Sequence, residues 1–138
     1  RDRIYGEGLR YAKITDGSLE LLLKLEKLAW QYQIFSLKTE FTPDFTGNVP
    51  LRAKMIEWIS KSELRKYFNY PYNIEFFESI DKKVSKITAS NINIYVDDHY
   101  KVITHPNLKV DSKYLFKAKA PDYPEIISID KFSEIKVD

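Results

Sequence analysis

The sequence contains no cysteine, and this absence removes several kinds of chemistry at once. Disulfides, cysteine-ligated zinc sites and thiol nucleophiles are all excluded. Histidine is also scarce, because His99 and His105 are the only two in the chain. We therefore expect no structural zinc site. A cytoplasmic location is the expectation for a chain without disulfides.

Long apolar runs are lacking as well. The run at 21–23 is closed at once by Lys24, whereas a membrane span needs about 20 apolar residues. We expect a soluble chain with no membrane partner. The first residues form no signal-peptide core and include no initiator Met, so we expect that the true start is missing. No linker or repeat divides the chain, and its length predicts a single domain, residues 1–138.

Composition and charge give only weak functional signals. Few Gln, one Met and abundant Ile, Tyr, Lys and Glu favour a thermophile, although an AT-rich genome gives a similar composition. The net charge of +2 is too small to indicate a nucleic-acid-binding protein. The first 70 residues, however, hold twelve Lys and Arg against nine Asp and Glu. We expect any basic surface in this half.

Hydrophobic spacing predicts helices in the first two thirds of the chain. The clearest is at about 17–33, with Leu25 and Leu28 in the core, and the others lie at about 50–69 and 73–87. In the last of these we expect Asn73 to cap the helix and the buried stripe to consist of Ile74, Phe77, Ile80, Val84 and Ile87. Residues 60–63 could instead be a capping box that starts a shorter helix, which would leave 53–59 as a strand. Short strands are expected at 9–14 and 34–41, and a loop at 42–48.

The hydrophobic period changes to two after residue 90. Ile92, Ile94 and Val96 alternate with polar residues, and the segment 100–104 continues beyond Asp97 and Asp98, which predicts a hairpin. Further strands are expected at 114–117, 125–129 and 132–137. The predicted fold class is therefore α+β, with helices in the first two thirds and an antiparallel β-sheet built mainly from the C-terminal part.

The predicted helix at 50–69 carries a basic stripe. Lys54, Trp58, Lys61 and Arg65 follow one another at spacings of four, three and four residues. Cations beside a flat aromatic ring suit a nucleic-acid backbone and its bases. The alternative is a solvated helix face on which the lysine stems cover the tryptophan.

Paired carboxylates are the second candidate for chemistry. Glu75 and Glu78 stand three apart in the predicted helix at 73–87, with Lys82 and Lys86 nearby. Two carboxylates in this arrangement can share a divalent ion or divide the roles of base and metal ligand. An ordinary surface ion pair between Glu78 and Lys82 explains the same residues.

The segment Thr42-Pro43-Asp44-Phe45 resembles the first half of the PD-(D/E)xK nuclease motif. The resemblance implies that Asp44 and a later acid, here Glu57, hold a metal. The resemblance does not extend to the rest of the motif, because Ile59 stands where the family has a lysine. A plain proline turn is the alternative. Similarly, Tyr95-Val96-Asp97-Asp98 looks like the catalytic turn of reverse transcriptases, but nothing else of a polymerase is visible, and we prefer a turn in which an Asp caps its own backbone.

The composition of the chain is rich in Ile, Tyr and Lys and contains no cysteine. In this respect the chain looks like the small orphan proteins of crenarchaeal filamentous viruses, some of which are nucleases. The resemblance implies an archaeal virus protein working inside the host cell. We therefore predict a DNA-binding protein and hydrolase, a nuclease that uses Mg²⁺ on phosphodiester bonds. The alternative is a non-catalytic structural or protein-interaction module, and a homo-oligomer is compatible with both.

Overall fold

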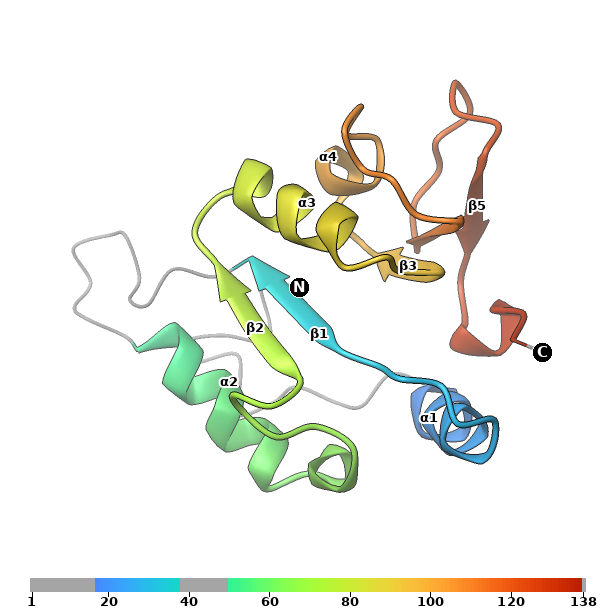
Figure 1. Cartoon of the computed structure of the whole chain (residues 1–138). Coiled ribbons are helices and arrows are strands. Elements are labelled where there is room, and N and C mark those ends of the chain that lie inside the picture. The colour runs from blue at the N-terminus through green and yellow to red at the C-terminus, as the bar shows by residue number, and fades with distance from the viewer. Residues whose placement is uncertain (1–16, 38–49, 138) are drawn as a thin grey trace.

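A computed structural model describes residues 17–37 and 50–137, and the structural statements below concern these two ranges. Helices and strands alternate along most of them, although the last two strands follow one another without a helix between them (Figure 1). The first range holds α1 (Ser18–Lys27) and β1 (Ile34–Leu37), and the second opens with α2 (Leu51–Ser60), the 3₁₀ helix η3 (Glu63–Lys66), β2 (Ile74–Phe77) and α3 (Ile80–Ala89). It continues with β3 (Ile94–Asp97), α4 (Tyr100–Ile103), β4 (Ser112–Phe116), β5 (Ile126–Ile129) and η4 (Phe132–Glu134). The strand predicted at 9–14 and the loop predicted at 42–48 lie outside the described residues.

All strand pairings in the described ranges are parallel. One sheet pairs β1 with β2, and a second has the order β3-β4-β5. The predicted antiparallel C-terminal sheet is therefore wrong. Helices are also not confined to the first two thirds of the chain, because α4 and η4 lie in the last third. Parallel neighbours need a crossover connection, and α2 and α4 lie in the crossovers between paired strands.

The predicted helix at 73–87 divides into a strand and a helix. Ile74 and Phe77 fit a helical period with Ile80, but the first two belong to β2. Ser79, rather than Asn73, caps the helix, since its hydroxyl accepts a hydrogen bond from the Lys82 amide at 3.2 Å. The buried positions were nevertheless predicted correctly for Ile74, Phe77, Val84 and Ile87.

The predicted helix at 50–69 is interrupted. α2 ends at Ser60, and the Ser62 hydroxyl accepts a hydrogen bond from the Leu64 amide at 3.1 Å, so a short 3₁₀ helix begins there. The alternative prediction was right that a new helical turn starts in this region. It was wrong that 53–59 forms a strand.

The predicted hairpin near residue 97 is also absent from the described structure. β3 ends at Asp97, and 100–103 forms the short helix α4 instead of a returning strand. β4 and β5 agree with the strands predicted at 114–117 and 125–129. The strand predicted at 132–137 is wrong, because η4 begins at Phe132.

Helices cover both faces of the β1–β2 pair (Figure 1). Ile34 and Ile74 face the core shared with α2, whereas Phe35 and Phe77 face the core shared with α3. The core on the α3 side continues to Tyr95 in β3, so one hydrophobic core joins the two sheets. This places the carboxyl end of β3 beside α3.

α1 packs against the C-terminal segment and buries less than predicted. Leu22 is buried, Leu25 is half-buried and Leu28 is 41% exposed, so the prediction that Leu28 lies in the core is wrong. Gly17 precedes the helix with φ of +86°, and a Cβ there would lie 3.2 Å from the backbone nitrogen of Ser133. Within the described ranges, no helix has the length and apolar character needed to cross a membrane.

Candidate functional site at the carboxyl end of β3

Lys83 interrupts the apolar stripe of α3. The stripe runs through Ile80, Val84 and Ile87, and Lys83 occupies a position on the same side. Its exposed fraction is 0%, which makes it one of the most deeply buried large side chains in the described structure. Lysine is almost never fully buried unless it is paired. The neighbouring elements must therefore supply a partner.

The partner is Asp97, the last residue of β3. Lys83 Nζ donates a hydrogen bond to Asp97 Oδ2 at 2.8 Å, and the side chains are 0% and 1% exposed. The Tyr95 hydroxyl donates to the same oxygen at 2.5 Å. Tyr95 and Asp97 are two apart in a strand and thus point to one face, the face that α3 covers.

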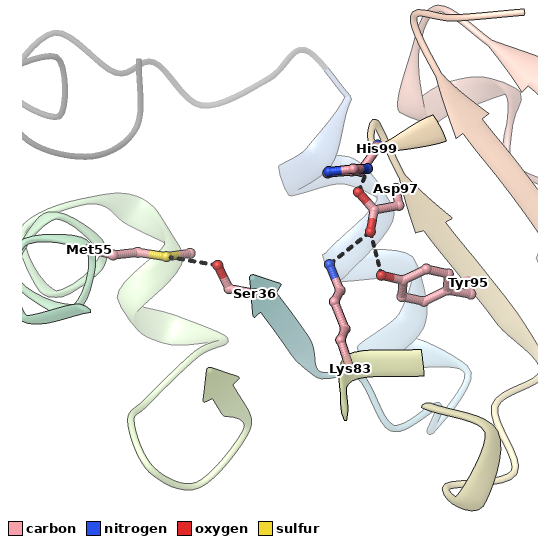
Figure 2. A network of polar contacts seen from close by, with 6 residues as sticks. All are labelled: Ser36, Met55, Lys83, Tyr95, Asp97 and His99. Atoms are coloured by element: carbon pink, nitrogen blue, oxygen red, sulfur yellow. Dashed lines mark hydrogen bonds and ion pairs between the residues drawn. The ribbon is translucent and has the colours of Figure 1, made fainter. Parts of the chain in front are cut away.

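The other oxygen of Asp97 organises the chain that follows the strand. The His99 amide donates to Asp97 Oδ1 at 3.0 Å, which confirms that Asp97 caps its own backbone. Figure 2 shows the Lys83 ammonium and the Tyr95 hydroxyl converging on this carboxylate, with the His99 ring beside it. His99 Nδ1 is buried and has no hydrogen-bond partner among the described residues. We refer to Lys83, Tyr95, Asp97 and His99 as the β3-edge cluster.

The first turn of α3 holds the side chain that contacts Asp97, because Lys83 is the fourth residue of this helix. α3 follows directly after the carboxyl end of β2, and Lys83 lies near the start of this helix. A helix amino end carries a partial positive charge that adds to that of the lysine. The edge therefore combines two sources of positive potential with a buried carboxylate.

The burial of this ion pair is difficult to explain by stability alone. Removing two charges from water costs several kcal/mol per ion, and the attraction between them often only offsets that cost. Within the described ranges only Ser36, Lys83 and Asp97 are buried polar or charged residues. Ser36 is not part of the cluster, because its hydroxyl points to the Met55 sulfur at 3.7 Å on the α2 side (Figure 2). The Lys83–Asp97 pair is thus the unusual polar feature of the core.

The predicted pair Glu75 and Glu78 is not brought together. Glu75 lies inside β2 and Glu78 immediately follows it, so residues three apart point to opposite faces of the strand. Glu78 instead faces α2, where its carboxylate lies 3.9 Å from the Arg52 guanidinium. The regular helical geometry expected for this pair is wrong.

Glu57 forms a local ion pair with Lys61. Lys61 Nζ donates to Glu57 Oε1 at 2.8 Å, and this hydrogen bond lowers the pKa of the Glu57 carboxyl. Asp44, its expected partner, lies outside the described residues. Across 17–37 and 50–137, no three His, Asp or Glu side chains form a group that could hold a metal ion.

The basic stripe is broken where α2 ends. Lys54 lies on α2, Lys61 follows its last residue and binds Glu57, and Arg65 lies on η3. The Arg65 guanidinium donates to the Ser62 carbonyl at 2.7 Å. Trp58 is partly buried against the core on the α2 side. The four side chains therefore do not form the continuous helical row that was predicted.

A surface groove on α3 is lined by none of the residues of the β3-edge cluster. It has a volume of about 500 Å³ and lies between α3 and the segment after α4, where His105 Nε2 is 3.0 Å from Asp81 Oδ1. His105 Nδ1 accepts a hydrogen bond from the Asn107 amide at 3.1 Å. Both ring nitrogens are thus occupied, and His105 has no nitrogen left to act as a base.

Comparisons of this chain with protein-family models, with curated proteins and with solved structures gave no significant match. Function must therefore be argued from the geometry.

Sequence reasoning missed Lys83 as a site residue, although a signal was present. A lysine at 83 falls among Ile80, Val84 and Ile87, on the buried side of an amphipathic helix. A charged residue in an apolar stripe requires a buried counter-charge. Asp97, at the end of an alternating apolar strand, was the available partner.

Proposed function

We propose that this chain is a DNA-directed, metal-dependent phosphoester hydrolase whose reacting groups gather at the carboxyl end of β3. The observation that supports this most is the buried Lys83–Asp97 pair at that edge. Proteins with open sheets of parallel strands bind ligands outside the carboxyl ends of those strands. Lysine supplies positive charge to phosphate, and carboxylates are the protein ligands of Mg²⁺.

The proposal gives separate roles to neighbouring residues. Asp98 follows Asp97 at the strand end and is exposed, so its carboxylate would hold Mg²⁺ together with oxygens of the substrate phosphate. Mg²⁺ when bound would polarise the phosphoryl group and favour attack by water. Lys83 would neutralise a phosphate oxygen, and Asp97 with Tyr95 would hold the ammonium in place. Hydrolysis breaks the P–O ester bond, and the leaving oxygen takes a proton from water.

Mg²⁺ does not require a cage of three protein ligands. It usually keeps several waters and binds through one or two carboxylates and the substrate phosphates. One exposed aspartate, Asp98, together with waters and substrate oxygens is compatible with that pattern. Because Lys83 is 0% exposed, substrate can reach it only if the residues that cover the Lys83–Asp97 pair move during turnover. The proposal requires this movement.

A non-catalytic structural or interaction module is the second candidate. The observation that favours it is the complete burial of the same pair, since a structural ion pair needs no access for substrate. The two candidates differ in one respect. Only the hydrolase requires the exposed Asp98 carboxylate for an activity.

Hydrolysis by the purified chain tests the proposal. The substrates are single-stranded, linear duplex and circular DNA and the small ester p-nitrophenyl phosphate, each with Mg²⁺ or EDTA, at moderate and high temperature. The proposal predicts product release that Mg²⁺ supports and EDTA abolishes. If no substrate is hydrolysed under any condition, the non-catalytic module is the better account.

A further inference from the structure

We infer that the turn at 69–73 is a stacking platform for single-stranded DNA. This inference rests on the proposed function, because it names the strand that would carry the phosphoester to the β3-edge cluster. Tyr72 is 89% exposed and Tyr70 is 51% exposed, the two highest values among the exposed large apolar side chains of the described residues. Core packing explains neither exposure.

Hydrogen bonds fix the backbone that presents these rings. The Asn73 side chain accepts from the Asn69 amide at 2.8 Å and donates to the Tyr67 carbonyl at 2.7 Å. The Tyr72 amide donates to the Asn69 carbonyl at 2.8 Å. A ring held out on a fixed turn loses little freedom when a ligand binds, which favours binding.

Aromatic and cationic side chains adjoin on this surface. The rings of Tyr70 and Phe76 have centroids 5.6 Å apart, and the Arg52 guanidinium lies 5.7 Å from the Phe76 centroid. Exposed rings beside cations are the combination that binds single strands, since bases stack on the rings and phosphates meet the charges.

The charge of the segment 51–73 indicates a polyanionic partner. It contains five cations and two acids, a net charge of +3, whereas the whole chain has a net charge of +2. The cations are Arg52, Lys54, Lys61, Arg65 and Lys66, and the acids are Glu57 and Glu63. A basic surface with protruding tyrosines suits DNA better than an apolar protein partner, whose binding site would be depleted of charge at its centre.

Fluorescence anisotropy with labelled oligonucleotides tests the platform on the full chain. The probes are single-stranded dT12, single-stranded dT2 and a 12-base-pair duplex. We expect Tyr72→Ala to raise the Kd for dT12 by roughly five- to 150-fold, and to have a smaller effect on the duplex. Ile127→Ala is the matched control, because Ile127 is an exposed apolar side chain on β5.

A charge-matched pair of variants tests the cations. Arg65→Ala/Lys66→Ala should reduce the slope of log affinity against log salt by about 1.4, since each phosphate contact on a single strand contributes about 0.7. Lys109→Ala/Lys136→Ala removes the same charge from exposed positions elsewhere and should leave the slope unchanged.

Parallel hydrolysis of p-nitrophenyl phosphate separates this inference from the proposed function. Weaker dT12 binding by Tyr72→Ala with normal hydrolysis of the small ester supports the platform. A wild-type protein that hydrolyses the ester but binds no DNA overturns the platform and retains the hydrolase. An unchanged dT12 Kd in Tyr72→Ala also overturns it. Tyr72-dependent dT12 binding without any hydrolysis supports the platform and contradicts the hydrolase.

Discussion

Lys83 and Asp97 are the residues on which the account depends. Each is buried and charged, and Lys83 Nζ lies 2.8 Å from Asp97 Oδ2. Neither was predicted as a site residue, because one looked like an ordinary helix lysine and the other like a turn aspartate. Their pairing depends on how α3 packs on β3, and no local pattern encodes that.

The first prediction at this scale concerns the stability of the pair. Lys83→Met should lower the free energy of unfolding by about 3–5 kcal/mol, because it leaves the Asp97 carboxylate buried without its cation. Urea denaturation measures this. The double variant Lys83→Met/Asp97→Asn should recover much of the loss, since neither charge remains. A single-variant loss below about 1 kcal/mol would mean that the pair is not buried as described.

The second prediction concerns Glu134. Its Oε2 accepts hydrogen bonds from the amides of Asp130 at 2.7 Å and Lys131 at 2.8 Å, and these bonds lower the pKa of the carboxyl. A lowered pKa in the folded state means that the contribution to stability is complete above the ordinary value of 4.5 and is lost as the pH falls below it. Glu134→Gln should therefore destabilise the protein at pH 7 and matter progressively less towards pH 3.

Thermal unfolding of wild type and Glu134→Gln across this pH range measures the effect. A difference between the two proteins that stays constant from pH 7 to pH 3 would contradict the assignment.

At the scale of elements, hydrophobic spacing predicted which residues are buried more accurately than it predicted their secondary structure. Ile74, Phe77, Val84 and Ile87 are buried as expected, yet the first two belong to a strand. The four residues of β2 are mostly apolar and stand just before a helix, so their spacing fits both a strand with a period of two and a helix with a period of 3.6. Only the tertiary fold decides between strand and helix here. The alternation of strands with helices was the available signal for parallel pairing. This signal was missed because the residues of β2 were assigned to the predicted helix at 73–87.

The third prediction compares two leucines of α1. Leu22→Ala should cost roughly 2–5 kcal/mol of stability because Leu22 is 7% exposed. Leu28→Ala should cost less than about 1 kcal/mol, since Leu28 is 41% exposed. Equilibrium unfolding of both variants provides the measurement. Equal losses would show that α1 packs through a different face.

At the scale of the whole molecule, two parallel sheets share one core through α3. This arrangement places the carboxyl end of β3 and the amino end of α3 at one edge, with the β3-edge cluster between them. The arrangement assumed for the predicted sites is wrong, because it required long helices that present acids and cations in rows. The residues of the β3-edge cluster instead come together near the end of a short strand. Which residues meet there depends on strand order, and this cannot be obtained from the spacing of residues along the sequence.

The most direct test of the hydrolase compares Asp98→Asn with Asp122→Asn in the Mg²⁺-dependent assay. Both aspartates are exposed, and the unfolding temperature of each variant, measured alongside, shows whether the variant keeps the wild-type fold. The account predicts that Asp98→Asn lowers kcat by at least about a hundredfold, because it removes the carboxylate that would hold Mg²⁺ at the β3 edge, while Asp122→Asn retains wild-type activity. Equal activity of wild type and Asp98→Asn would contradict it.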